Sequence, residues 1–93
     1  ATNTLMATYP NPATQPNGIS VDPIHEKVYL MSQAENLVQI FDEKTDTFEA
    51  TTVPVGGAPA NAAIDYIHGL LYVGNTGEAG GPPPPSVSVI KLQ

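Results

Sequence analysis

The stretch VDPIHEKVYL at residues 21–30 recurs as IDYIHGLLYV at residues 64–73. The two copies are 43 residues apart, and the match extends without a gap from Thr2–Met31 onto Thr45–Gly74. Nine of these thirty aligned pairs are identical, including the Asp, the His and the Tyr of the quoted stretch. A repeat in the low forties has the length of a four-stranded propeller blade. The repeat therefore predicts two copies of one β-rich unit.

Short β-branched and aromatic runs, separated by Pro, Gly, Asn and Asp, predict where the strands lie. In the first copy we expect four strands, at Gly18–Asp22, Val28–Met31, Leu37–Phe41 and Thr47–Val53. In the second copy we expect three, at Asn61–Asp65, Leu70–Gly74 and Ser86–Ile90. The repeated tyrosines, Tyr29 and Tyr72, are expected in the core. Helices are not expected, because ten Pro and eight Gly interrupt the chain.

The fourth strand of the second copy is predicted at the other end of the chain. Thr4–Tyr9 matches Thr47–Thr52, and the C-terminal residues followed by the N-terminal ones read like residues 40–48. We therefore expect blade one at about 16–53, and blade two at about 59–93 together with the N-terminal strand at 4–9. A strand that completes a sheet at the other end of a chain removes an exposed sheet edge.

The predicted fold is an all-β β-propeller segment of two four-stranded antiparallel blades. Its ring would be completed by other chains or by missing blades. An eight-stranded sandwich or meander also suits short strands at this spacing. That alternative, however, does not require two copies of one unit of more than forty residues.

Composition limits the core and the partners of this chain. Ninety-three residues without cysteine give a thin core that no disulfide reinforces, so we expect partner subunits to contribute to stability. The formal net charge is -6, which argues against nucleic acid and against anionic membrane surfaces as partners. No apolar run approaches the ~20 residues that a membrane span needs, so membrane insertion is not expected.

Several units of the chain resemble the YVTN-type β-propeller repeat. They are Pro16–Pro23, Lys27–Leu30, Val38–Asp42, Thr45–Thr47, Leu71–Asn75 and Ser86–Ile90. The resemblance covers essentially the whole chain and implies the propeller fold, although members of the family usually carry more blades in one chain. It also favours an extracellular or periplasmic location of a secreted protein. For function it is almost silent, since such repeats occur in surface-layer, binding and enzymatic proteins.

Equivalent histidines, His25 and His68, follow Asp22 and Asp65 by three residues in the two copies. Two imidazoles with nearby carboxylates are a possible metal site. We expect structural turn residues instead, because blade geometry spaces neighbouring turns too widely for shared ligation and Asp often accepts backbone N–H bonds in turns. A metal at His25 and His68 is kept as the alternative, and no cofactor is expected.

The largest difference between the copies is Gly74–Pro85, which carries six extra residues relative to the first copy. Loops of this kind often carry function. In a propeller this connection shares a face with the loop that enters the inner strand, and the same face presents Gln33 and Glu35. We therefore predict a ligand-binding loop face with contributions from Asn17, Asn61, Asn75 and Glu78.

These patterns favour a non-catalytic binding or scaffolding module that acts through its loop face within a larger ring. The expected partners are other propeller blades, as a homo-oligomer or as the remainder of a larger protein, with a small molecule or a glycan as the ligand class. The sequence carries no nucleophile elbow, phosphate loop, zinc pattern or dinucleotide fingerprint, so no catalytic residue is assigned. The alternative is a fragment of a propeller enzyme, of lactonase or oxidoreductase type, whose catalytic residues lie mostly on other blades.

Overall fold

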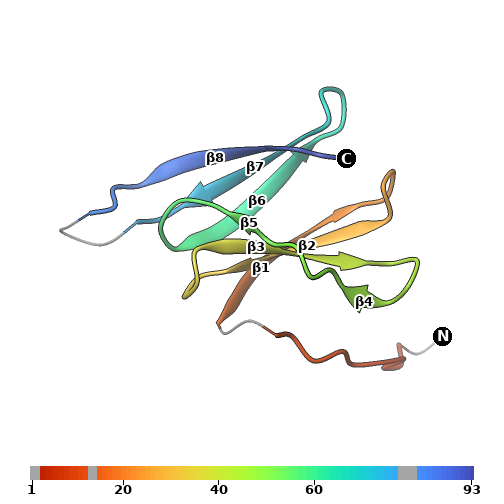
Figure 1. Ribbon diagram of the computed structural model, residues 1–93. Coiled ribbons are helices and arrows are strands. Elements are labelled where there is room, and N and C mark those ends of the chain that lie inside the picture. Colours follow the sequence, from red (N-terminus) through yellow and green to blue (C-terminus); the bar gives the residue numbers. More distant parts are fainter. Residues whose placement is uncertain (1–2, 13–14, 78–81) are drawn as a thin grey trace.

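The computed structural model describes residues 3–12, 15–77 and 82–93, which form two antiparallel sheets (Figure 1). The first sheet contains β1 (Pro16–Asp22), β2 (Lys27–Ser32), β3 (Leu37–Asp42), β4 (Thr47–Phe48) and β5 (Val53–Pro54). The second sheet contains β6 (Pro59–Asp65), β7 (Leu70–Asn75) and β8 (Ser86–Lys91). The all-β prediction is confirmed for the described residues, which contain no helix and thus none that could cross a membrane.

Six of the predicted strands form within two residues of their expected ends. The seventh, Thr47–Val53, is divided into β4 and β5, which both pair with β3. Phe41 pairs with Phe48 and Val38 pairs with Val53, so the outer strand has two more residues than β3 over this stretch. Such a bulge interrupts the ladder of hydrogen bonds and bends the strand.

The N-terminal segment does not pair with the second sheet of its own chain. Thr4–Tyr9 forms no strand, and the ring of Tyr9 packs on Phe41 of β3 with their centroids 5.3 Å apart. In Figure 1 this segment runs below β4, whereas β8 lies at the top. The expected fourth strand of blade two is therefore not formed within the chain. Phe41 faces away from the second sheet, because its neighbour Ile40 packs on the core, so Tyr9 lies on the side of the first sheet that is remote from β8. Its pairing with β8 of another copy stays a prediction.

The core lies between the two sheets. The first sheet contributes Tyr29, Met31 and Val38, and the second contributes Leu71 and Val73. Each of these side chains is at most 4% exposed. The strand β1 lies beside β6, so the first strands of the two copies are neighbours in space.

The two repeated tyrosines have different surroundings. Tyr29 is 4% exposed, but its equivalent Tyr72 is 39% exposed. Along β7 the side chains alternate, so Leu71 and Val73 point to the first sheet while Tyr72 points to the outer face of its own sheet. The prediction that Tyr72 lies in the core is therefore wrong for the single chain, because no second sheet covers that face.

The first hairpin turn of each copy contains a left-handed residue at the same place. Glu26 has a φ of 56° in the first copy, and Gly69 has a φ of 66° in the second. A residue with a Cβ atom pays about 1–2 kcal/mol for this conformation, whereas glycine adopts it readily. The first copy is therefore strained where the second is not.

We expect Glu26→Gly to raise the free energy of unfolding by about 1 kcal/mol, because it relieves this strain. Gly69→Ala should lower it by a similar amount. An added Cβ at Gly69 meets no atom within 4 Å, so the backbone conformation alone sets that effect. Urea unfolding of both variants measures the two changes. A loss of stability in Glu26→Gly would contradict the strain and point to the Glu26–Lys44 ion pair of 3.9 Å.

Candidate functional site

The loops predicted to bind a ligand gather at one edge of the two sheets, on the left of Figure 1. Backbone hydrogen bonds join them there: Val55 N donates to Asn36 O at 3.0 Å, and Thr76 N donates to Ala58 O at 3.0 Å. The side-chain Oδ1 of Asn36 also accepts a bond from Ala58 N at 2.8 Å. The β5–β6 connection thus holds the β2–β3 turn on one side and the β7–β8 loop on the other. We call this side of the molecule the loop edge.

The structure brings together only some of the predicted binding residues. Asn17 Nδ2 donates to Gln33 Oε1 at 3.2 Å on the surface of the loop edge. Asn61 is exposed on the outer face of the second sheet, opposite Gly74 of β7. Glu78 lies outside the described residues.

Asn75 is 3% exposed and has a structural environment. Its Nδ2 atom donates to Ser86 Oγ at 3.1 Å and to Ser88 Oγ at 2.9 Å. The Oγ of Ser88 in turn accepts a bond from Gly56 N at 3.2 Å. The Asn75 amide therefore ties the two ends of the β7–β8 loop to the β5–β6 connection, and it does not face the solvent.

The opposite edge holds the two Asp–His turns. Asp22 Oδ1 accepts bonds from Ile24 N at 3.0 Å and His25 N at 3.3 Å, and its Oδ2 lies 2.5 Å from His25 Nδ1. Asp65 makes the same three contacts in the second copy, with its Oδ2 2.7 Å from His68 Nδ1. Each aspartate caps its own turn and orients its own histidine. In the part of the chain that the structure describes, no group of three or more His, Cys, Asp or Glu is placed to hold a metal ion.

The hydrogen bond with His68 lowers the pKa of Asp65 below its usual value. A carboxyl whose pKa is lowered by folding stabilises the fold above its unfolded pKa of about 4, and this contribution is lost as the pH falls through the folded pKa. We expect His68→Ala to raise the pKa of Asp65, as measured by carbon NMR of its carboxyl group, and to weaken the loss of stability in acid. His25→Ala is the matched control, because it leaves the Asp65 turn intact. An Asp65 titration that is the same in His68→Ala and in the wild type would contradict this assignment.

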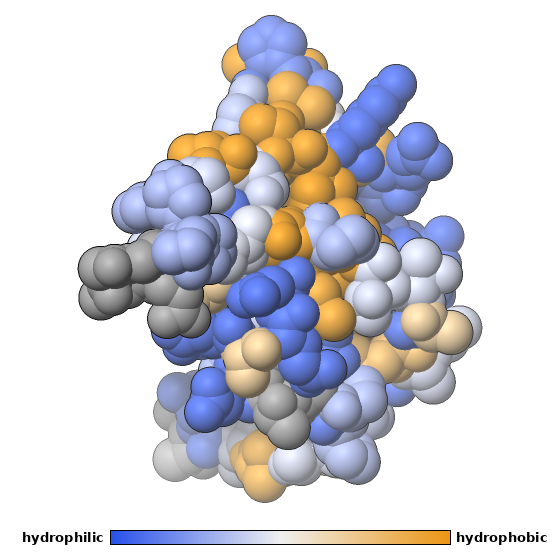
Figure 2. Space-filling view, turned by 60° about the vertical axis from the view of Figure 1, so that its left-hand side comes forward, coloured by the Kyte–Doolittle hydropathy of each residue, from blue (hydrophilic) through white to orange (hydrophobic). Residues whose placement is uncertain are grey.

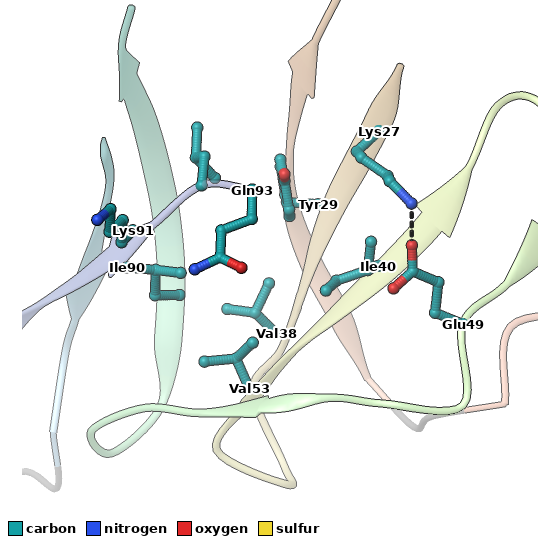
Figure 3. A pocket seen from close by; sticks show the side chains of 10 residues that line it. Lys27, Tyr29, Val38, Ile40, Glu49, Val53, Ile90, Lys91 and Gln93 are labelled. Atoms are coloured by element: carbon teal, nitrogen blue, oxygen red, sulfur yellow. Dashed lines mark hydrogen bonds and ion pairs between the residues drawn. The ribbon is translucent and has the colours of Figure 1, made fainter. Parts of the chain in front are cut away.

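A cleft of about 240 Å³ opens between the sheets (Figure 3). Its walls are largely apolar side chains from both sheets, namely Tyr29, Val38, Ile40, Val53 and Ile90. At its rim Lys27 Nζ pairs with Glu49 and lies 3.3 Å from Asp42 Oδ2. The hydrogen bond with Glu49, and then that with Asp42, raises the pKa of Lys27 even though burial opposes it. A lysine whose protonated form is stabilised by two ion pairs is a poor nucleophile.

A second, shallower hollow of about 310 Å³ lies on the outer face of the second sheet. Its lining includes Asn61, Ala63, Tyr72, Gly74 and Val87. The sequence-based prediction missed this surface because it placed Tyr72 in the core. The signal that could have found it is the glycine at position 74, which stands where the first copy has Met31 and leaves the space beside Tyr72 unfilled.

No family model and no curated protein matches this chain. The resemblance to the YVTN-type repeat therefore depends on the sequence motifs alone. The geometry separates polar groups that stabilise the fold from those that another molecule can contact. Asp22 and Asp65 are engaged in turns, and Lys27 is engaged in ion pairs with Asp42 and Glu49. The exposed amide of Asn17, the partly buried amide of Gln33 and the open hollow beside Tyr72 are surfaces that another molecule can reach.

Proposed function

We propose that this chain is two blades of a β-propeller and acts as a non-catalytic binding or scaffolding module within a larger ring. The observation that carries the proposal is the stacking of two repeated antiparallel sheets with β1 beside β6. In a propeller the inner strands of successive blades lie next to one another around the central channel. The order of the strands also suits this architecture, because the outer strands β4 and β5 lead directly into β6.

The state of the ionisable groups supports a role other than catalysis. A general acid or base must reach the proton that it transfers. Asp22 is 1% exposed and accepts three bonds within its own turn. Lys27 forms ion pairs with both Asp42 and Glu49 at the rim of the cleft. These side chains hold the fold together and are not poised for a reaction.

The loop edge is the binding surface of the proposed module. Its amides at Asn17 and Gln33 can both donate and accept hydrogen bonds, as sugar hydroxyls do. The bonds that join the three loops keep this surface in one arrangement, which reduces the entropy lost on binding. The net charge of -6 disfavours an anionic ligand. A neutral, hydroxyl-rich ligand such as a glycan fits these properties best.

The test is binding of the full chain to a printed glycan array, followed by calorimetric titration of the glycan that binds best. We expect Asn17→Ala to weaken binding about tenfold, the effect of one lost hydrogen bond of ~1.4 kcal/mol. Lys44→Ala, at the opposite edge, should bind like the wild type. An array without any bound glycan, or an Asn17→Ala chain with undiminished affinity, would overturn the assignment of the loop edge.

A further inference from the structure

Two sheet faces keep exposed apolar side chains in the single chain, although Tyr9 covers Phe41 on the first of them. On the outer face of the first sheet, Ile19 is 63% exposed and Val21 is 48% exposed. On the outer face of the second sheet, Val87 is 66% exposed and Val89 is 54% exposed. Figure 2 shows apolar side chains gathered in a band that runs down the upper half of the molecule. Exposed apolar surfaces of this kind mark sites of association.

These two open faces are equivalent to the two faces that already meet inside the chain. Val21 corresponds in the repeat to Ile64, which packs against the core from the second sheet. Val89 corresponds to Ile40, which packs against the same core from the first sheet. The outer face of the first sheet therefore corresponds in the repeat to the inner face of the second sheet. The outer face of the second sheet corresponds to the inner face of the first sheet.

The side-chain sizes on the open faces also compensate for each other. In the internal contact, the buried Met31 faces a sheet that carries the small Ala62. On the outer face of the second sheet Gly74 replaces Met31, and this replacement leaves the hollow of about 310 Å³. On the outer face of the first sheet the larger Ile19 replaces Ala62. One face thus carries a larger side chain and the other a space, the complementary pair that a well-packed contact requires.

We propose that the outer face of the second sheet binds the outer face of the first sheet of a second copy of this chain. This inference rests on the proposed function, because it names the partner that completes the ring. A contact between two unlike surfaces closes into a ring when successive rotations add to a full turn. The incoming copy also brings its Thr4–Tyr9 segment to the side of β8 that no strand of the described chain covers. That segment repeats the sequence of an outer strand and adds the fourth strand there.

The rim of the contact differs from the internal one. Asn61 stands where the first copy has Gly18, and a Cβ at Gly18 would lie 2.2 Å from Ala60 O. Two copies therefore meet less closely at this rim than β1 and β6 do within the chain. The gap that is left between the two copies at this rim lies at the loop edge.

Sedimentation velocity of the full chain tests the proposal. We expect a species of three or four times 9.7 kDa that dissociates on dilution. Val21→Asp and Val89→Asp each place a charge on one open face, and each should give a monomer. Their melting curves in dilute solution should match the wild type, because both side chains are about half exposed in the single chain. Ile67→Asp, whose side chain is 90% exposed on the β6–β7 turn, is the control that should leave the mass unchanged.

Mixing the two face variants separates a head-to-tail contact from a contact of one face with itself. Val21→Asp keeps the outer face of the second sheet intact, and Val89→Asp keeps that of the first. An equimolar mixture should therefore form a one-to-one dimer and nothing larger. A mixture that stays monomeric, or a single variant that assembles like the wild type, overturns the proposal.

The complementary sizes of the side chains at positions 74 and 19 allow a rescue experiment. Gly74→Met should fill the hollow and weaken assembly about tenfold or more. Adding Ile19→Ala should restore it. The single chain tolerates the methionine, since a Cβ at Gly74 meets only Asn61 O at 3.8 Å. A wild-type chain that stays monomeric overturns the inference but leaves glycan binding at the loop edge intact. Assembly without any glycan binding removes the proposed binding function instead.

Discussion

Gly18→Ala is expected to lower the free energy of unfolding by about 2–5 kcal/mol. Gly18 has a φ of 86°, which a residue with a Cβ atom adopts only with strain. The added Cβ would also lie 2.2 Å from Ala60 O and 3.1 Å from Ala60 C, both backbone atoms. Backbone atoms cannot rotate away as a side chain can, so β1 and β6 would have to separate. A domain with a total stability of about 5–15 kcal/mol loses much of it in this variant.

Gly69→Ala is the matched control for this effect. It places the same methyl group at another left-handed glycine, with a φ of 66°, but no atom lies within 4 Å of the new Cβ. The difference between the two variants therefore measures the close approach of the sheets, separately from backbone strain. Urea unfolding followed by circular dichroism provides both values. Equal losses in the two variants would show that β1 and β6 do not lie as close as described.

Tyr29→Ala is expected to cost about 3–5 kcal/mol, because it removes a buried aromatic ring from the core between the sheets. Tyr29 is 4% exposed, and burial is the largest of the effects that raise its pKa. The repeat offers a comparison at the equivalent position. Tyr72 is 39% exposed, so Tyr72→Ala in dilute solution should cost no more than about 1 kcal/mol.

A high protein concentration should reduce this difference between the two tyrosine variants if copies associate as inferred. In the assembled form the ring of Tyr72 is covered by the next copy, as Tyr29 is covered by the second sheet. Tyr72→Ala should then lower the melting temperature at high protein concentration and leave it nearly unchanged in dilute solution. A large loss of stability in dilute Tyr72→Ala would contradict the open face described for the second sheet.

The proposed binding surface lies at the rim of the proposed contact between copies, and the centre of that contact lies on the sheet faces. The loop edge holds the exposed amide of Asn17 and the partly buried amide of Gln33, whereas the association faces hold Val21 and Val89. Loops at the edge are held by hydrogen bonds, and the sheet faces are apolar. A ring built through the faces would therefore present several loop edges side by side, and binding of a repetitive ligand would gain from their number.

The strands and turns were largely predictable, because their causes lie within a few residues. Alternating apolar residues form strands such as β7 wherever Pro, Gly and Asp end the run. The Asp22 and Asp65 caps depend on backbone groups two and three residues away, so the sequence alone indicates them. The bulge between β4 and β5 was not predictable from alternation, because it arises from how the outer strand pairs with β3.

Burial was decided by the tertiary structure. Tyr29 and Tyr72 occupy the same place in the repeat, yet only the first is covered by another sheet. The sequence placed Asn75 in an exposed loop, but its side chain is buried and donates hydrogen bonds to Ser86 and Ser88 of β8. The sequence by itself determined two repeated sheets and their turns, since local backbone preferences act along the chain. Which faces are buried, and where Thr4–Tyr9 lies, depends on what packs across each sheet, and no local pattern contains that information.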